Sequence, residues 1–535
     1  MQLYPTRSTF HVAVAGAGLV AVGVAERLAP VAAFGGAMLL AVAIGRAVAT
    51  LAVTRLRTAG FEMVWTSKTR VQSVALGVPV VLEGELRNRG SAPVRAVALR
   101  PIVSSLLEAS VEPKAVDLAP GGRARIAVTV QPRRVGRWGV HGLALEVRGT
   151  SLGGEALYEV PLLFANPHGI EVLPQTFAAL LSSPRGGRAR RAAESGRAFN
   201  VPGDGGELLE LRDHVPGDAF KRIAWKASAR RGRLLVREMA REGRDIVWLV
   251  VDASVELWAG APGRAPLDGV VEEVGALAVR HLWRGERVGL VVTASRVRSW
   301  IAPSEGAAHG AAIAKALASA SSVVDADRSE LDETMVASRV AEHARPLDPR
   351  ALADVRKGDL DALARRADEL RVHAPFSPRV PFAPTPREQS LRHYLAAFGV
   401  ESPPRADGER EASERALAAA LERLAAEKPR ASVIHVWAPS PVRAEGMAKA
   451  LTRVRAARIR VRWTVPAFDS AVGADPSPRS AVADAVDDAV RARAAAARWR
   501  AERLLRRLGV QVVAPPRAPA AAKETGREPA EGATG

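Results

Sequence analysis

The feature that most constrains this chain is a pair of apolar runs near its N-terminus. Phe10 to Ala25 contain one non-apolar side chain, His11, and Leu28 to Ile44 contain none. The runs, roughly 16 and 17 residues long, lie at the lower edge of the ~20 residues that cross a bilayer, and the second extends further if Arg46 snorkels. We predict a transmembrane helical hairpin over residues 1–57. A cleaved signal peptide and a buried core hairpin are the alternatives.

The basic residues around this hairpin predict its orientation. Only Arg27 lies in the turn between the two runs, whereas several cations flank the outer ends. These are Arg7, Arg46, Arg55, Arg57, Lys68 and Arg70. By the positive-inside rule, both termini and the main domains after the hairpin are expected in the cytoplasm.

Residues 61–175 alternate apolar and polar side chains, as at Val78, Val80 and Leu82, in short runs separated by Gly, Pro and Asn turns. This spacing predicts an antiparallel β-sandwich. We expect the arginines of the turn at 132–139 to be solvated, with a basic binding loop as the alternative. Residues 176–205 are rich in Arg and Gly and are expected to form a basic linker.

The densest local signal lies between Gly206 and Glu238 and centres on a Pro-Gly-Asp turn. We predict that Asp218 of this turn caps a helix beginning directly after it. Arg212 and Arg222 lie close enough in sequence to pair with the Asp218 carboxylate. We expect Trp225 to be buried and to fix the entry of the next strand. A capping and ion-pair cluster is one interpretation of this segment, and a ligand site is the other.

The same segment resembles the signature of a bacterial family called domain of unknown function 58. The matching residues are Arg212, Gly217, Asp218, Arg222, Ile223, Trp225, Ala229, Arg237 and Glu238. The resemblance implies a multi-pass anchor in the inner membrane, a β-sandwich and a von Willebrand factor A-like domain. Family members are typically encoded beside MoxR-type AAA ATPases, so the resemblance also implies such an ATPase as a partner and an interaction role for the signature residues. It implies no reaction.

Beyond the signature, strand and helix patterns alternate, which predicts a doubly wound parallel α/β sheet in a multidomain chain. We place the signature and the first part of this domain at 206–345, a helical insertion at 346–430, the remainder at 431–514 and a disordered tail at 515–535. The insertion has Pro-rich stretches between helical segments, and we expect it to cap the sheet. A disordered excursion is the alternative.

One candidate metal site follows the first strand of this domain. A metal-binding A-type domain uses Asp-x-Ser-x-Ser there, because a carboxylate and two hydroxyls give Mg²⁺ the oxygen ligands that it prefers. This chain has Asp252, Ser254 and Glu256, with Glu where the second Ser belongs. We therefore expect no cofactor, and Mg²⁺ at these three residues is the alternative.

Composition and motifs exclude several classes of function. The chain has no cysteine, which excludes thiol nucleophiles, disulfides and Cys-type zinc sites. It also has no phosphate loop, no His-Glu-x-x-His helix and no Gly-x-Ser-x-Gly elbow. The net charge is +19, but the basic stretches at 443–462 and 491–507 carry few aromatic residues. Helices that face an anionic membrane surface or are simply solvated therefore fit this charge better than a nucleic-acid site.

Taken together, these features predict a non-enzymatic, membrane-anchored adaptor or chaperone-like scaffold. It would act with a MoxR-type AAA ATPase on a cell-envelope or protein-maturation client, and would contact the lipid bilayer and other membrane or envelope proteins. A metal-dependent adhesion or protein-binding module is the first alternative. An enzyme with a dispersed, unrecognised site is the second.

Overall fold

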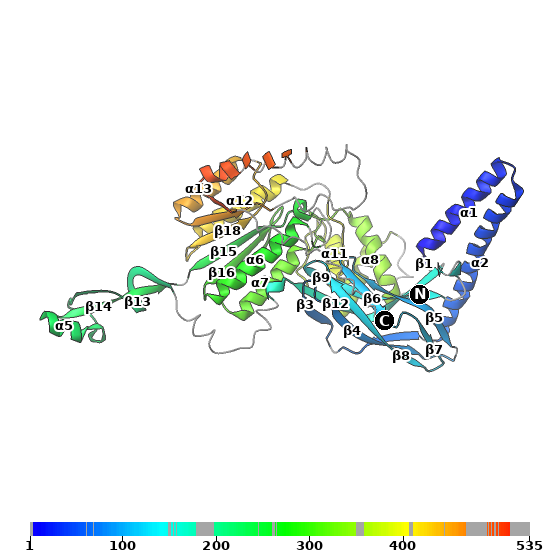
Figure 1. Ribbon diagram of the computed structural model, residues 1–535, viewed down its shortest axis with the longest axis horizontal. Helices are drawn as coiled ribbons and strands as arrows, with labels where there is room; N and C mark the ends of the chain where they lie inside the picture. Colours follow the sequence, from blue (N-terminus) through cyan, green and yellow to red (C-terminus); the bar gives the residue numbers. More distant parts are fainter. Residues whose placement is uncertain are drawn as a thin grey trace, which may run out of the picture.

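A computed structural model of the chain describes residues 4–513 with internal gaps, the longer of which are 148–150, 178–196, 259–262, 349–357, 406–409 and 467–488. The expected tail and most of the expected linker lie outside the described residues. The described elements follow one another along the long axis of the molecule: a helix pair, two sheets with a shared core, a parallel sheet and a two-stranded arm (Figure 1).

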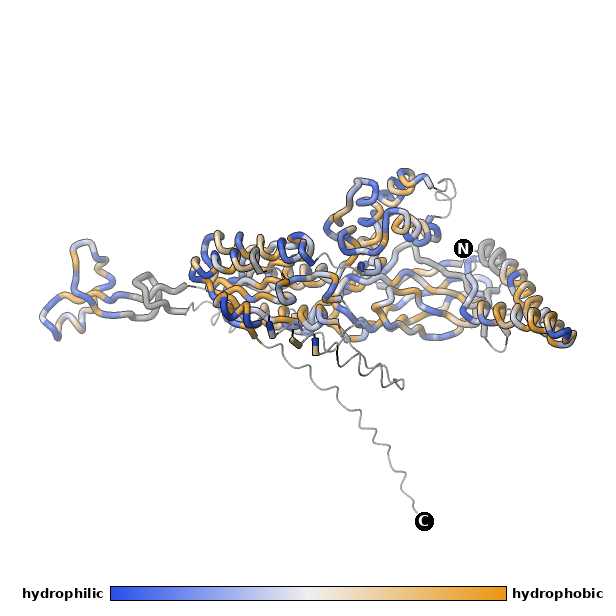
Figure 2. The backbone as a smooth tube through the Cα atoms, turned by 90° about the horizontal axis from the view of Figure 1, so that it is seen from above, coloured by the Kyte–Doolittle hydropathy of each residue, from blue (hydrophilic) through white to orange (hydrophobic). Residues whose placement is uncertain are grey.

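The N-terminal hairpin consists of α1 (Arg7–Ala25) and α2 (Ala29–Ala59). α1 and the part of α2 up to Leu51 are each long and apolar enough to cross a membrane, and little of either is covered by the rest of the protein. The backbone of this hairpin, at one end of the molecule, is coloured largely as hydrophobic in Figure 2. The helices approach closely at small residues, since a Cβ on Gly23 would lie 2.4 Å from the amide nitrogen of Ala32.

Two sheets follow the hairpin, and together we call them the β unit. The first is antiparallel, with the order β2 (Phe61–Trp65), β4 (Val80–Asn88), β8 (Arg123–Pro132) and β6 (Leu107–Glu112). The second has the order β1 (Tyr4–Pro5), β12 (Tyr158–Leu173), β9 (Gly136–Val147), β5 (Val94–Val103) and β7 (Val116–Leu118). A short hairpin, β10 (Ser151–Leu152) and β11 (Glu155–Ala156), lies between β9 and β12.

One strand pair in the β unit is parallel, where we expected only antiparallel neighbours. β3 (Val71–Ala75) runs parallel to the end of β12, and β1 pairs with the beginning of β12. β12 is long enough, at 16 residues, to pair with both short strands along its edge.

The β unit is held together by one hydrophobic cluster with side chains from both sheets. Leu82 and Val128 come from the first sheet, and Val140 and Ile170 from the second; each is almost fully buried. In β4, alternate residues are buried, so the alternation in the sequence corresponds to one inner and one outer face.

The next two strands form a separate arm. β13 (Arg197–Asp213) and β14 (Leu235–Gly243) pair antiparallel, and the chain between them forms the short helices η1 (Phe220–Arg222) and α5 (Trp225–Arg231). The arm extends away from the parallel sheet, at the opposite end of the molecule from α1 and α2 (Figure 1). Residues 197–205, which we expected in a linker, therefore belong to a strand, because β14 supplies their hydrogen-bonding partner.

The expected α/β sheet follows the arm. Its order is β17 (Val297–Ser304), β16 (Arg287–Thr293), β15 (Ile246–Asp252), β18 (Val433–Trp437), β19 (Arg460–Thr464) and β20 (Gln511–Val513). Every pair is parallel except β16–β17, which form a hairpin.

Helices cover both faces of this sheet. α6 (Pro266–Trp283) and α7 (Ala307–Ala320) share one core with β15, whereas α12 (Arg410–Ala426) and α13 (Ala444–Ala456) share the other. β15 lies between β16 and β18, so the winding reverses direction at its carboxyl end. Ligand crevices in such folds form at this point, and the 3₁₀ helix η2 (Val255–Trp258) follows directly.

A further group of helices forms the helical insertion: α8 (Glu333–Leu347), α10 (Leu360–Leu370), η3 (Arg371–His373) and α11 (Pro386–Phe398). These helices share a core of their own. Our expected boundaries for the insertion, 346–430, were wrong at both ends, since α8 belongs to this core and α12 packs on the parallel sheet.

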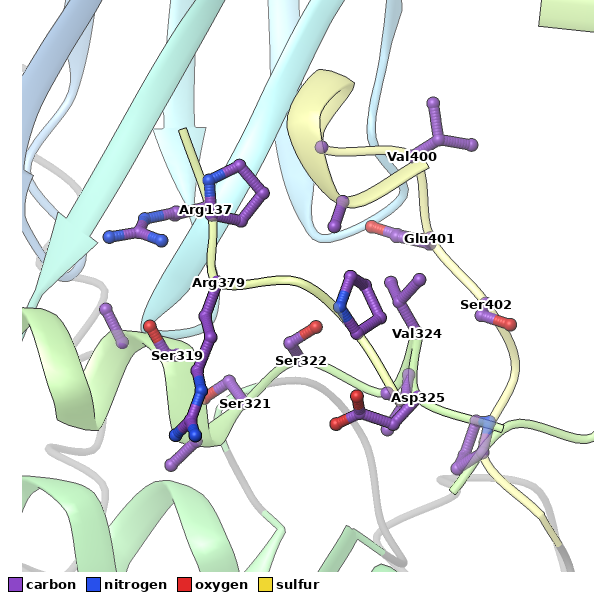
Figure 3. A pocket seen from close by; sticks show the side chains of 18 of the residues that line it. Arg137, Ser319, Ser321, Ser322, Val324, Asp325, Arg379, Val400, Glu401 and Ser402 are labelled. Carbon is purple, nitrogen blue, oxygen red and sulfur yellow. The ribbon is translucent and has the colours of Figure 1, made fainter. Parts of the chain in front are cut away.

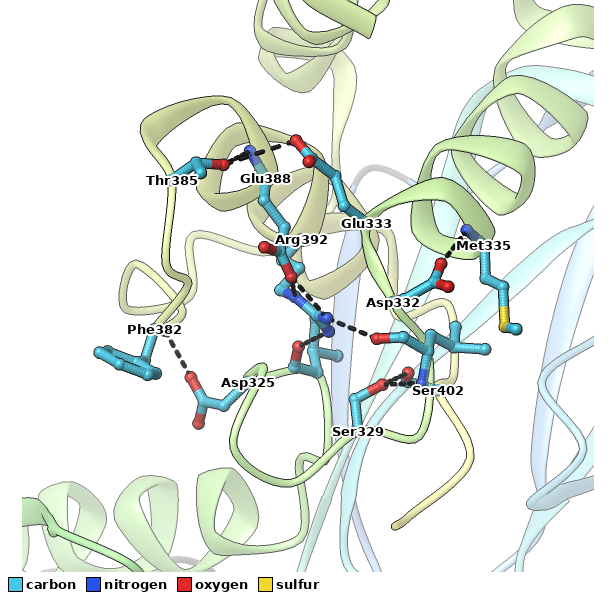
Figure 4. Close-up of polar contacts among 12 residues, drawn as sticks. Asp325, Ser329, Asp332, Glu333, Met335, Phe382, Thr385, Glu388, Arg392 and Ser402 are labelled. Atoms are coloured by element: carbon cyan, nitrogen blue, oxygen red, sulfur yellow. Dashed lines mark hydrogen bonds and ion pairs between the residues drawn. The ribbon is translucent and has the colours of Figure 1, made fainter. Parts of the chain in front are cut away.

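We expected the insertion to cap the parallel sheet, and this expectation was also wrong. It packs on the β unit: the Ser104 hydroxyl donates to the Gly399 carbonyl at 2.8 Å, and His343 of α8 contacts His141 of β9 at 3.2 Å. A buried Arg392 holds its centre together by donating to Glu388 and to the carbonyls of Val324 and Leu331 (Figure 4).

Candidate functional site

The signature residues gather at the tip of the arm. Arg212 of β13 forms a two-pronged ion pair with Asp218, with nitrogen–oxygen distances of 2.8 and 2.5 Å, and its Nε lies 3.4 Å from Glu238 of β14. The Val215 amide donates to the same Asp218 carboxylate at 2.8 Å. The hydrogen bonds from Arg212, followed by that from the Val215 amide, lower the pKa of Asp218 to about 2. Asp218 therefore stays ionised and closes the turn.

The structure contradicts our prediction that Asp218 caps the following helix. α5 begins at Trp225, its N-cap is Ala224, and no side chain caps it. The carboxylate oxygens of Asp218 already accept hydrogen bonds from Arg212 and the Val215 amide. In this arrangement Asp218 stabilises the turn before η1 instead.

Trp225 is not in the core either. Its ring is 53% exposed and lies against Phe220, which is 73% exposed, with ring centroids 5.1 Å apart. The physical reason is that two strands and one short helix have no second layer to bury an indole. The buried anchors are Ile223, which bridges to Val236, and Ser228, whose hydroxyl accepts from the Leu235 amide at 2.9 Å.

The other signature residues lie around this turn. Gly217 has a φ of 107°, a conformation that glycine adopts at little cost. Arg222 lies in η1 and is exposed, as is Arg237 of β14, which stands opposite Leu211 of β13. Ala229 is exposed on α5. We did not single out Ser228 from the sequence, although it lies within the signature.

The candidate metal ligands lie at the carboxyl end of β15. Asp252 is buried, and its carboxylate accepts from the Ser254 amide at 3.1 Å. Burial raises the pKa of Asp252 to about 7. The Glu256 carboxylate forms an ion pair with Arg410, which also donates to the Ser440 carbonyl after β18. Within the described part of the chain, no three His, Asp or Glu side chains gather as a metal site requires.

A second candidate site, which we did not predict, is a cavity of about 620 Å³ where the β unit, the parallel sheet and the helical insertion meet (Figure 3). We call it the arginine cavity. It is lined by arginines from all three units: Arg134, Arg137, Arg296, Arg298, Arg339 and Arg379. The carboxylates in its lining are Asp325 and Glu401, and Ser319, Ser321 and Ser322 contribute polar groups. Its volume is in the range of small-molecule pockets.

Two of these arginines come from the turn at 132–139. We expected the arginines of this turn to be solvated, and for Arg134 this expectation was wrong. Arg134 is almost fully buried and pairs with Asp268 of α6, with Nε 2.8 Å from Oδ1. Arg137 pairs with Glu171 of β12 at 3.0 Å. The turn therefore joins β-unit residues to the parallel domain.

Two others share Asp325: Arg296, which directly precedes β17, at 3.3 Å, and Arg298 of β17 at 2.7 Å. Burial lowers the pKa of the Arg298 guanidinium. Two arginines two residues apart, where a strand begins, are the sequence signal that could have revealed this half of the cavity. No sequence spacing indicates that these two arginines lie near Arg134.

Comparison with known proteins gives a partial match. Residues 210–365 match the family model described as "Protein of unknown function DUF58". Uncharacterized proteins of Mycobacterium bovis and Mycobacterium tuberculosis are 29% identical over 109 residues, which is 20% of this chain and 34% of theirs. The chain thus spans about a third of the length of these curated relatives.

Similarities to solved structures are weak. Native Escherichia coli α2-macroglobulin aligns with 74% of this chain and 24% of its own, at 14% identity and a TM-score of 0.15. The PapD-like domain of human CEP192 aligns with 22% of this chain and 84% of its own, at 12% identity and the same TM-score. Neither likeness assigns a fold. The similarity that remains is to a family of unknown function, and it extends from the tip of the arm into α10.

Proposed function

We propose that this protein is a non-enzymatic, membrane-anchored adaptor that presents the tip of its arm to a protein partner. In this proposal α1 and α2 cross the bacterial inner membrane as a multi-pass anchor, and the remaining chain is cytoplasmic. The β unit is a β-sandwich, and the parallel sheet is the core of a von Willebrand factor A-like domain.

The observation that carries the proposal is the exposure of Phe220 and Trp225 at the tip of the arm. Large aromatic side chains are enriched at the centres of protein interfaces, where they are buried by the partner. The ion pair between Arg212 and Asp218 fixes the turn that precedes both rings. A rigid turn lowers the entropy lost when the partner binds.

The charge of the tip indicates the kind of partner. Exposed cations surround the aromatic pair: Lys221, Arg222, Lys226, Arg230, Arg231 and Arg233. The complementary surface is acidic with an apolar centre. We propose a MoxR-type AAA ATPase as the owner of that surface, since the family resemblance implies this partner, and a cell-envelope or protein-maturation client for the complex.

The test is binding of a purified MoxR-type ATPase from the same organism to the full chain in proteoliposomes. Replacing both Phe220 and Trp225 with Ser should weaken binding at least ~10-fold, which corresponds to about 1.4 kcal/mol. The matched control is Trp283→Ser, since Trp283 is 60% exposed at the end of α6 and is not part of the arm. Unchanged affinity in the double variant, or equal loss in the control, contradicts the proposal.

The alternative of a metal-dependent binding module makes a different prediction. Its site would use Asp252 and Ser254, and the buried Ser254 hydroxyl has no hydrogen-bond partner among the described residues. Glu256 would have to leave Arg410 to take part. Partner binding that requires Mg²⁺ and disappears in Asp252→Ala would favour this alternative over docking through the arm.

A further inference from the structure

We propose that the arginine cavity binds a small phosphorylated molecule of the nucleoside-phosphate class, held by arginines from the β unit, the parallel sheet and the helical insertion. This site does not depend on the arm or on its partner. The inference rests on the charge, the donors and the size of the cavity.

The first argument is that the arginines of the cavity outnumber the carboxylates. This holds even when Asp268, Glu171 and Asp327 are counted, which lie outside the lining and pair with Arg134, Arg137 and Arg296. Arg296 and Arg298 share Asp325, which also accepts the Phe382 amide at 2.7 Å. Arg379 donates to the Arg298 carbonyl, and Arg339 donates to the Glu401 carbonyl at 3.4 Å. Neither Arg339 nor Arg379 has a carboxylate partner among the described residues, and both are exposed at the cavity. They are therefore available to an anionic ligand.

A further buried cation stands behind the wall. Arg328 is almost fully buried and, among the described residues, donates to three carbonyls: Ala253 at 2.7 Å, Ala320 at 2.9 Å and Ser322 at 2.5 Å. It fixes the turn that carries Ser321 and Ser322 and connects this turn to the end of β15. Arg328 is thus a positioning residue, and its charge adds to the positive potential of the cavity.

The donors in the cavity fit phosphate. A guanidinium offers two parallel N–H groups that match two phosphate oxygens, and arginines on several elements can bind a group with three such oxygens from different sides. Ser319, Ser321 and Ser322 lie on the same wall as the tip of Arg379 (Figure 3). The hydroxyls of Ser321 and Ser322 can donate to the remaining oxygens, whereas that of Ser319 donates to the Lys315 carbonyl at 2.9 Å.

The size and the apolar lining indicate more than an inorganic ion. About 620 Å³ exceeds the space that a phosphate or diphosphate needs. Trp138, Trp258, Val292 and Val380 contribute apolar surface beside the cations. A ligand with a flat apolar part and a charged part fits this division, and this is the chemistry of a nucleoside phosphate.

The test is isothermal titration of the full chain in detergent with ADP, pyrophosphate and citrate, with ionic strength matched by NaCl. We expect saturable, competitive binding of ADP and pyrophosphate, with ADP the tighter, and much weaker binding of citrate. Arg339→Gln combined with Arg379→Gln should weaken ADP binding at least ~10-fold. Arg453→Gln is the matched control, since Arg453 is 54% exposed and pairs with Glu422 on the surface.

A second variant separates a defined site from general electrostatic attraction. Val380 lines the cavity and is 53% exposed, so Val380→Trp fills part of the space without changing any charge. It should weaken ADP binding while the melting temperature stays unchanged. No saturable binding, equal binding of citrate, equal loss in Arg453→Gln, or full ADP binding by Val380→Trp would each overturn the proposal.

Discussion

The buried ion pair between Arg134 and Asp268 allows the sharpest test of how the β unit is joined to the parallel domain. Both side chains are less than a tenth exposed, and a second contact, from Nη2 to Oδ2, measures 3.0 Å. Asp268 also accepts the Ala265 amide at 3.0 Å, where α6 begins. Arg134→Met leaves the Asp268 carboxylate buried without its cation, and we expect this to lower the free energy of unfolding by about 3 to 5 kcal/mol.

The loss should depend on pH in a defined direction. Burial already raises the pKa of Asp268, and without Arg134 that pKa rises further. An acid whose folded-state pKa is raised contributes stability at low pH that is lost as pH rises. The Arg134→Met variant should therefore recover stability between pH 8 and pH 5, by at most about 1.4 kcal/mol per pH unit.

Urea unfolding of the detergent-solubilised chain, followed by tryptophan fluorescence, measures this effect, because Trp138 and Trp258 lie beside the pair. Adding Asp268→Asn to Arg134→Met should restore most of the stability, since the neutral amide still accepts from Ala265. The control Arg133→Met changes an exposed neighbour and should leave the midpoint unchanged. A loss below ~1 kcal/mol, or one that is independent of pH, would refute the reasoning.

Three further outcomes are expected. Burial lowers the pKa of His141 to about 4. In urea titrations, the wild type should therefore lose about 2 kcal/mol of stability between pH 7 and pH 5, and His141→Gln should not. The control His373→Asn, at an exposed position, should lose as much as the wild type. Gly35→Leu should separate α1 from α2 in protease-protection assays, because a Cβ at Gly35 would lie 2.6 Å from the Gly16 carbonyl oxygen. The control Gly36→Leu faces open space and should leave the two helices together. Trp225→Ala should cost far less than the ~3–5 kcal/mol of a buried indole in the same urea assay.

Local patterns in the sequence were enough to identify most of the individual elements. The alternation of strand and helix that we predicted beyond the signature is present, for example in β18, α13 and β19. The apolar N-terminal runs correspond to two helices of membrane-spanning length. These patterns are reliable because the spacing of apolar residues reports which face of an element is buried, and that face is a property of the element itself.

What only the tertiary structure decided was which elements come together. Trp225 has a large apolar side chain of the kind that is usually buried, yet it is exposed because no second layer covers the arm. The prolines and helices of the insertion gave no indication that it packs on β9 and β12.

The arginine cavity depends on the same kind of information. Arg134, Arg298 and Arg379 are far apart in sequence and meet because three units converge. Whether a side chain is solvated, paired or free to bind depends on its neighbours in space, and those neighbours are set by long-range packing that no local pattern records.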